Sequence, residues 1–254
     1  MPLVVISSPK GGAGKTTLTA NLAVGMRQRG WRVTVVDFDS QNALRFHLAP
    51  EAGERDGLAR ATFEGRPWRT TLAACRVGVE MVPFGPSTMA ARLHLDEALT
   101  STRLRAEFAD LERGPADLVL VDTAPGEGVL QERLDELADV GLAVFLTDGG
   151  SIALLPNYRN GAFLRPPLPG EPPRFGVLNQ VDRRRRLSRD IAEFVEARAS
   201  DRFLGSVRYD EAVAEAAASG FTALEAETED VGAVSDVKRL AASLDQLVRE
   251  VCAA

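Results

Sequence analysis

The chain has 254 residues, of which 45% are hydrophobic and 26% are charged, and its formal net charge at pH 7 is −6. That length supports one large α/β domain with a buried core, and the negative charge argues against strong nonspecific affinity for nucleic acid. Two cysteines are too few for a disulfide framework, so we expect a cytoplasmic protein. We expect no secretion signal, because a strand pattern starts at residue 2, and no transmembrane segment, because no apolar run approaches the roughly 20 residues that span a bilayer.

The first elements in chain order are a strand, a glycine-rich loop and a helix. Residues 2–7 form an apolar, β-branched run typical of a buried parallel strand, and apolar residues recur at helical spacing over 16–29. Between them, residues 8–17 read Ser-Pro-Lys-Gly-Gly-Ala-Gly-Lys-Thr-Thr. In such a loop the backbone N–H groups converge on phosphate oxygens, beside the positive end of the following helix. The pattern therefore predicts a nucleoside triphosphate site.

Individual roles follow from this loop. The chain has 30 basic residues, but only three are lysines, and two of those lie in the loop. We expect Lys15 to reach the β- and γ-phosphates and the Thr16 hydroxyl to ligate Mg²⁺. Pro9 stands where the ordinary P-loop has glycine, and a dinucleotide-binding loop would instead need glycine at Thr17 and no lysine. The expected nucleotide contacts come from Gly11, Gly12, Ala13, Gly14, Lys15, Thr16 and Thr17.

Three aspartates follow buried-strand patterns. Residues 33–37 end in Asp37, with Asp39 two positions on, and residues 118–121 run into Asp122. In extended chain, Asp37 and Asp39 point to one side. Open parallel sheets bind ligands at the carboxyl ends of their strands, so we expect an acidic side of the nucleotide site there. Each aspartate taken alone is also typical of a strand end or helix cap.

Strand and helix patterns alternate through the rest of the chain. This alternation predicts an α/β fold, namely a doubly wound, mostly parallel sheet with helices on both faces, in a single domain over residues 1–254. A helix is expected over 235–251, and the proline-rich run 165–173 reads as an extended surface connection. The remaining strand patterns lie near Val79, Leu142, Phe175 and Phe203.

The string from Lys10 to Thr17 resembles the deviant Walker A motif of the ParA/MinD ATPases, and the later motifs follow in family order over nearly the whole chain. The resemblance implies a P-loop NTPase fold of the SIMIBI/MinD-like kind, ATP and Mg²⁺ as cofactors, and slow Mg²⁺-dependent hydrolysis by an ATP-dependent homodimer. It implies that Lys10 crosses the dimer interface to the phosphates of the facing subunit. A second cation there would stabilise transition-state charge, as an arginine finger does.

The resemblance also assigns the acidic side. Asp37 would hold Mg²⁺ through a coordinated water, and Asp39 would orient or activate the attacking water. Residues 118–126 resemble a Walker B and switch II segment, in which Asp122 would support the metal and the Gly126 amide would sense the γ-phosphate.

The base contacts are likewise implied by resemblance. Asn179, at the end of the strand pattern 175–179, would meet the adenine edge, although a simple turn role for it stays open. Residues 204–213 resemble the segment that covers the base, with Arg208 where proline is usual and Asp210 at the acidic position. The guanine signature Asn-Lys-x-Asp is not present, because Gln180 occupies the lysine place.

The segments between the shared motifs resemble the branch of the cellulose biosynthesis protein BcsQ (YhjQ). This implies a cytoplasmic ATPase serving accessory subunits of the cellulose synthase complex on the cytoplasmic face of the inner membrane, peripherally or at a cell pole. Alternatives are a ParA-type partition or MinD-type positioning ATPase, and a non-catalytic nucleotide-dependent scaffold. Arg183–Arg186, at the start of a predicted helix, could meet DNA or acidic lipid, but such runs are more often a solvated face. The segments that resemble the BcsQ branch are 42–48, 56–69, 82–85 and 210–215.

Overall fold

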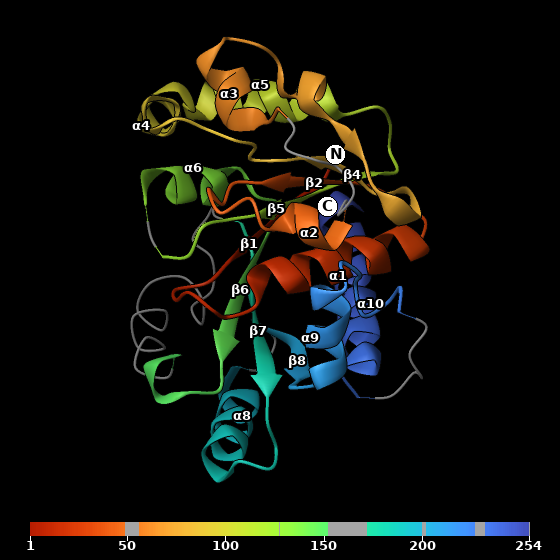
Figure 1. Ribbon diagram of the computed structural model, residues 1–254. Coiled ribbons are helices and arrows are strands. Elements are labelled where there is room, and N and C mark those ends of the chain that lie inside the picture. The colour runs from red at the N-terminus through yellow and green to blue at the C-terminus, as the bar shows by residue number, and fades with distance from the viewer. Residues whose placement is uncertain (49–55, 127, 152–171, 200–201, 227–231, 254) are drawn as a thin grey trace.

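The computed structural model describes residues 1–48, 56–126, 128–151, 172–199, 202–226 and 232–253. Eight strands form one sheet in the order β3-β4-β2-β5-β1-β6-β7-β8, and every pair is parallel except β3 with β4 (Figure 1). The predicted mostly parallel, doubly wound sheet is therefore confirmed. The strands are β1 Leu3–Ser7, β2 Arg32–Asp37, β3 Ala73–Ala74, β4 Glu80–Val82, β5 Asp117–Asp122, β6 Val140–Leu146, β7 Arg174–Val181 and β8 Phe203–Arg208.

Helices cover both faces of this sheet. The described α-helices are α1 Lys15–Gln28, α2 Leu44–Leu48, α3 Leu58–Phe63, α4 Met89–Ala98, α5 Ser101–Leu111, α6 Val129–Leu137, α8 Arg186–Ala199, α9 Glu211–Ala218 and α10 Gly232–Ala253, with 3-10 turns η1 Trp68–Thr71 and η2 Arg76–Gly78. One core cluster joins a sheet face to α1, α2 and α10, and a second joins the other face to α3, α4, α5 and α6. A third cluster packs α8 on β6 and β7.

Burial explains the apolar strand patterns. All six residues of β5 are buried, because helices lie on both faces of the central strands. The segment that follows α3 adds an aromatic cluster to the second core. Trp68 is fully buried, and its ring meets Phe38 and Phe108 edge-on at centroid distances of 5.4 and 5.7 Å.

Element boundaries differ modestly from the sequence prediction. The last helix, α10, extends beyond both ends of the predicted 235–251 stretch. Helix α8 begins at Arg186, so three arginines of the basic run precede it. Most of the proline-rich run 165–173 lies outside the described residues. Within the described part of the chain, no helix is long and apolar enough to cross a membrane.

Candidate nucleotide-binding site

The loop between β1 and α1 has the conformation that the glycine spacing predicts. Gly12 and Gly14 both have a φ of 76°, the left-handed region that glycine adopts without strain. Gly14 is also the N-cap of α1, and a Cβ there would lie 2.5 Å from Nδ2 of Asn179. Gly11 and Gly12 are exposed, so the loop is open on its outer side. Backbone N–H groups at this helix N-terminus form a ready site for phosphate.

Lys15 lies buried at the start of α1. Its Nζ donates to the Ser8 hydroxyl at 3.1 Å, and only 6% of the residue is exposed. Burial lowers the pKa of Lys15, while the charges of Asp122 and Asp39 oppose that shift. An ammonium near two carboxylates partly balances their charge and can bind an incoming phosphate.

Asp37 and Asp122 form a buried pair of carboxylates. They are register partners on β2 and β5, and both are fully buried. Burial raises the pKa of Asp122 to about 7, against a hydrogen bond from Thr16 and the charge of Lys15. Burial, followed by the charge of Asp122, raises the pKa of Asp37 well above its usual range.

The Asp37–Asp122 pair fits a divalent cation. One oxygen of each carboxylate, Oδ2, is buried without a hydrogen-bond partner, which is costly unless a cation or its bound water satisfies it. Among the described residues, no three His, Cys, Asp or Glu side chains form a metal cluster of their own. Mg²⁺ commonly takes one or two carboxylates together with substrate phosphates, and the neighbouring Thr16 hydroxyl completes such a donor set.

Asp39 is held in a turn directly after β2. Its N–H donates to Oδ1 of Asp37 at 2.9 Å, and its own Oδ1 accepts from the Gln41 N–H at 2.9 Å. The turn closes with a bond from the Asn42 N–H to the Asp39 carbonyl at 2.8 Å. Asp39 is therefore coupled to Asp37 through the backbone while its carboxylate stays partly exposed at the sheet edge.

Gly126 lies against the phosphate loop. Its N–H donates to the Ser8 carbonyl at 3.1 Å, and its φ is 95°. A γ-phosphate contact from this amide therefore requires it to exchange the Ser8 carbonyl for a phosphate oxygen.

Lys10 is engaged within its own subunit. Its Nζ forms an ion pair with Oδ2 of Asp148 at 2.5 Å, and both side chains are about two-fifths exposed, at 41% and 40%. Asp148 follows β6, and its Oδ1 accepts from the Ser151 N–H at 2.7 Å. The hydrogen bond from Lys10 is the main reason that the pKa of Asp148 is lowered. Reaching another subunit would require Lys10 to leave this partner.

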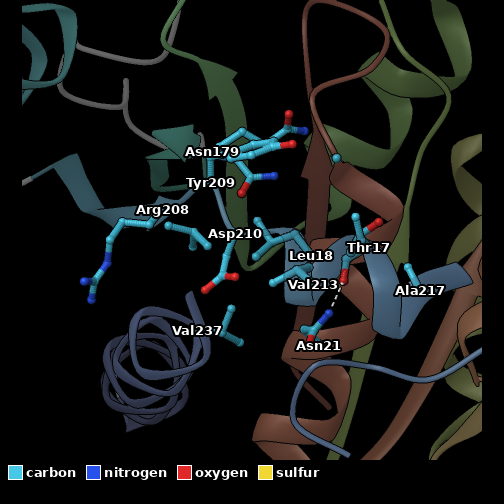
Figure 2. A pocket seen from close by; sticks show the side chains of 14 residues that line it. Thr17, Leu18, Asn21, Asn179, Arg208, Tyr209, Asp210, Val213, Ala217 and Val237 are labelled. Carbon is cyan, nitrogen blue, oxygen red and sulfur yellow. Dashed lines mark hydrogen bonds between the residues drawn. The ribbon is translucent and has the colours of Figure 1, made fainter. Parts of the chain in front are cut away.

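A cavity of about 170 Å³ adjoins the phosphate loop (Figure 2). Its walls come from the start of α1, the ends of β7 and β8, α9 and α10. Thr17 is part of the lining, and its carbonyl accepts from the Asn21 amide at 2.8 Å. The apolar lining includes Leu18, Val207, Val213 and Val237, while Asn179, Gln180, Tyr209 and Asp210 supply polar groups.

The charged groups of Arg208 and Asp210 bind the protein itself. The Arg208 guanidinium points away from the cavity beside α10 (Figure 2), where it donates to both carboxylate oxygens of Asp236 at 2.7 and 3.0 Å. Asp210 accepts from the N–H groups of Ala212 at 3.1 Å and Ala233 at 3.2 Å, so it caps both α9 and α10. These two residues shape the cavity wall by fixing the segment that carries them.

Asn179 lies between the cavity and the phosphate loop, and its Nδ2 donates to the Ala13 carbonyl at 2.8 Å. Asp182, three residues on, occupies the position of the guanine-reading aspartate in the Asn-Lys-x-Asp signature. Its carboxylate accepts from the Arg184 N–H and guanidinium at 2.9 to 3.2 Å. It is therefore engaged with its own loop.

The structure thus brings the expected phosphate, metal and base residues to one sheet edge, and it adds partners that the sequence analysis did not single out. Asp148 follows a strand end, so the rule that located Asp122 could have found it. Asp236 had no comparable signal, because its partner Arg208 is distant in sequence.

Solved structures of other proteins share this fold. The cell division ATPase MinD of Pyrococcus furiosus superposes with a TM-score of 0.78 over 97% of this chain and 99% of that one, at 22% identity. The MinD of Pyrococcus horikoshii OT3, complexed with Mg-ADP, gives a TM-score of 0.72 over 98% of both chains at 18% identity. This chain therefore has the fold of these MinD proteins, with a glycine-rich loop between its first strand and first helix.

The sequence profile of the family described as "Cellulose biosynthesis protein BcsQ" matches residues 1–243. The chain belongs to that family. The cellulose biosynthesis protein BcsQ of Escherichia coli K12 is 27% identical over 156 residues, which are 58% of this chain and 60% of that protein. The aligned part thus spans about three-fifths of the length of the curated relative.

Proposed function

We propose that this chain is a Mg²⁺-dependent ATPase that hydrolyses ATP slowly and acts as an ATP-dependent homodimer. The observation that carries the proposal is the pair Asp37 and Asp122, each with a buried oxygen that lacks a partner, beside Lys15 and an open glycine loop. A cation with a bound triphosphate would satisfy all of these groups together. The Mg-ADP complex of a protein with the same fold supports this choice of ligand.

In the proposed reaction, Thr16 and Asp122 would hold Mg²⁺ together with Asp37, which would act through a coordinated water, and Lys15 would neutralise the β- and γ-phosphates. Asp39 orients the attacking water. Lys10 of each subunit leaves Asp148 and completes the phosphate site of the other subunit. Turnover is slow because the two half-sites must assemble before hydrolysis, and Gly126 links the γ-phosphate to the switch segments.

The cavity beside the loop is proposed to take adenine. It lies next to Gly14, where a base joined to loop-bound phosphates would fall, and it combines apolar walls with the amides of Asn179 and Gln180. Asp182 is tied to Arg184, so it does not offer the carboxylate that reads guanine. Arg208 and Asp210 act by fixing the wall of this cavity.

The process served is proposed to be cellulose biosynthesis, on the strength of the family's printed description. In this role the ATP-bound dimer acts as a switch for accessory subunits of the cellulose synthase complex. The protein works in the cytoplasm and is held at the inner membrane or a cell pole through those partners. The ATP-bound chain is expected to co-purify with these subunits.

Phosphate release by the purified chain tests the ATPase proposal. We expect slow phosphate release with ATP and Mg²⁺. Lys15→Ala should abolish both this release and ATP binding, because Lys15 is the loop lysine on which Asp122 and Asp39 act, whereas Lys10 pairs with Asp148. The third lysine of the chain, Lys238 on α10, provides the matched control, and Lys238→Ala should keep parental activity. Activity that survives Lys15→Ala would refute the proposal.

A DNA-partition ATPase is the second candidate, favoured by the four exposed arginines Arg183–Arg186. Each of these arginines already pairs with Asp182, Asp190 or Glu196, which reduces the charge they present. This candidate predicts ATP-dependent DNA binding that weakens steeply with salt in a gel-shift titration.

A non-catalytic scaffold is the remaining alternative. In that case, phosphate release would stay at background even with partner proteins added.

A further inference from the structure

Gln180 has an unusual backbone at the mouth of the nucleotide site. Among the described residues, only Asn42, Val77 and Gln180 are non-glycine residues with positive φ, and Gln180 has a φ of 55°. A left-handed conformation costs roughly 1–2 kcal/mol for a residue with a Cβ. Such strain concentrates at functional sites, where surrounding contacts maintain it. Its location, between the phosphate loop and the base cavity, is therefore informative.

The strained residue changes which way its side chain points. In a regular strand, residues 179 and 180 would point to opposite faces of the sheet. Here the pairing of β7 with β8 shifts register between Leu178 and Val181. Asn179 donates to the Ala13 carbonyl at 2.8 Å, and Gln180 Nε2 donates to the Gly12 carbonyl at 3.4 Å. Both amides therefore reach the same loop.

The two acceptors matter because of peptide geometry. In a trans peptide, the carbonyl of one residue and the N–H of the next point in opposite directions. Fixing the Gly12 carbonyl on one side directs the Ala13 N–H to the other side. Fixing the Ala13 carbonyl directs the Gly14 N–H in the same way. The amides also leave no space at Gly14, where a Cβ would lie 2.5 Å from Asn179 and 3.1 Å from Gln180.

We infer that Gln180 is a positioning residue of the nucleotide site: its left-handed backbone brings its amide beside that of Asn179, and the pair orients the loop N–H groups toward the phosphates. The inference rests on the proposed ATP site and names a residue that sets its preorganisation. Gln180 itself does not contact the phosphates. It acts on the loop before the nucleotide arrives, which reduces the ordering that binding requires.

Three variants separate the effect of the Gln180 side-chain amide from the effect of its strained backbone. Gln180→Gly removes the amide and suits the positive φ, and Gln180→Met removes the amide but keeps the strain. Val77→Gly is the matched control, because Val77 has the same φ of 55° and is exposed in η2, outside the nucleotide cavity. The measurements are ATP and ADP dissociation constants by calorimetry, the melting temperature, and hydrogen exchange of the Ala13 and Gly14 amides in nucleotide-free protein.

We expect both Gln180 variants to bind ATP and ADP about fivefold more weakly, the size of one lost hydrogen bond. The Ala13 amide should exchange faster in both variants. Gln180→Gly should melt at or above the parental temperature, so that weaker binding cannot come from unfolding, and Val77→Gly should bind as the parent does.

Parental affinity and parental Ala13 exchange in Gln180→Gly would overturn the inference and leave residue 180 as a strand irregularity. If the unmodified chain binds no nucleotide, the proposed function fails, but the exchange measurement still decides the role of Gln180. Unchanged exchange in that case overturns the inference as well.

Discussion

Asp37 and Asp122 are buried carboxylates whose ionisation is costly to the nucleotide-free fold. Both side chains are fully buried, and each keeps an oxygen without a partner. The folded-state pKa of Asp122, about 7, lies above its ordinary value of 3.8, so the folded protein binds a proton that the unfolded chain releases. The loss of stability caused by ionising Asp122 is absent below pH 3.8. It grows as the pH rises from 3.8 to about 7 and is complete above about pH 7.

The variant Asp122→Asn tests this directly. At pH 8, without nucleotide, its free energy of unfolding should exceed that of the parent by about 1–3 kcal/mol, because the buried charge is gone. The gain should shrink steadily as the pH is lowered toward 5. Mg²⁺-dependent ATP binding should be lost in the same variant. Chemical denaturation across this pH range measures the first effect and calorimetry the second.

Asp117, at the other end of β5, provides the matched control. Burial raises its pKa, but hydrogen bonds from Arg32 and from the N–H groups of Arg113 and Gly114 outweigh this, so the net pKa is lowered. Asp117→Asn should therefore destabilise the fold at pH 8 and leave Mg²⁺ dependence intact. Stabilities that change in the same direction in both variants would contradict the assignment of Asp122.

At the scale of secondary-structure elements, two contacts join the end of β8 to the start of α10. The Arg208 guanidinium donates to both carboxylate oxygens of Asp236, and Asp210 caps the first turn of α10. Asp236 is 3% exposed, so its charge depends on Arg208 and on Arg239, which also donates to it. The cavity wall is therefore positioned by α10 through two carboxylates.

We expect Asp236→Asn to lower the free energy of unfolding by about 1–3 kcal/mol, since it removes charge-assisted hydrogen bonds from a buried group. ATP affinity should fall as well, because the segment 208–210 is released. Asp190→Asn breaks the exposed pair with Arg186 and is the control, with an expected effect below about 0.5 kcal/mol. Equal effects of the two substitutions in thermal melts would show that α10 does not fix the wall.

Local sequence patterns predicted the elements better than the contacts between them. Apolar runs identified β1, β2 and β5 because these strands are buried on both faces. The two-residue strand β3 carried no such signal, since it pairs only at the sheet edge beside β4. The Arg208–Asp236 contact could not be predicted, because it joins residues 28 positions apart whose meeting depends on how α10 packs.

At the scale of the whole molecule, the parallel sheet gathers the candidate site at one edge. The glycine loop follows β1, Asp37 ends β2 with Asp39 two positions on, Asp122 ends β5 and Asn179 lies near the end of β7. This convergence was predictable, because the carboxyl ends of parallel strands share one edge. The restraint of Lys10 by Asp148 was not predictable, because the packing of the turn after β6 decides which carboxylate Lys10 meets.

The ion pair between Lys10 and Asp148 matters for the proposed dimer that ATP holds together. Lys10 is about two-fifths exposed at the open side of the loop and pairs with a residue of its own subunit. In the proposed dimer it exchanges that partner for the phosphates of the facing subunit. The exchange replaces one exposed ion pair, worth little, with contacts to a multiply charged anion.

The most direct test is the mass of the particle in solution with ATP and Mg²⁺, measured by light scattering alongside ATP binding by calorimetry. We expect the parent to double in mass with ATP but not with ADP. Lys10→Ala should bind ATP with an affinity within about threefold of the parent and remain a monomer, because its own phosphate site is intact. A parent that stays monomeric with bound ATP, or a Lys10→Ala variant that still doubles in mass, would contradict the account.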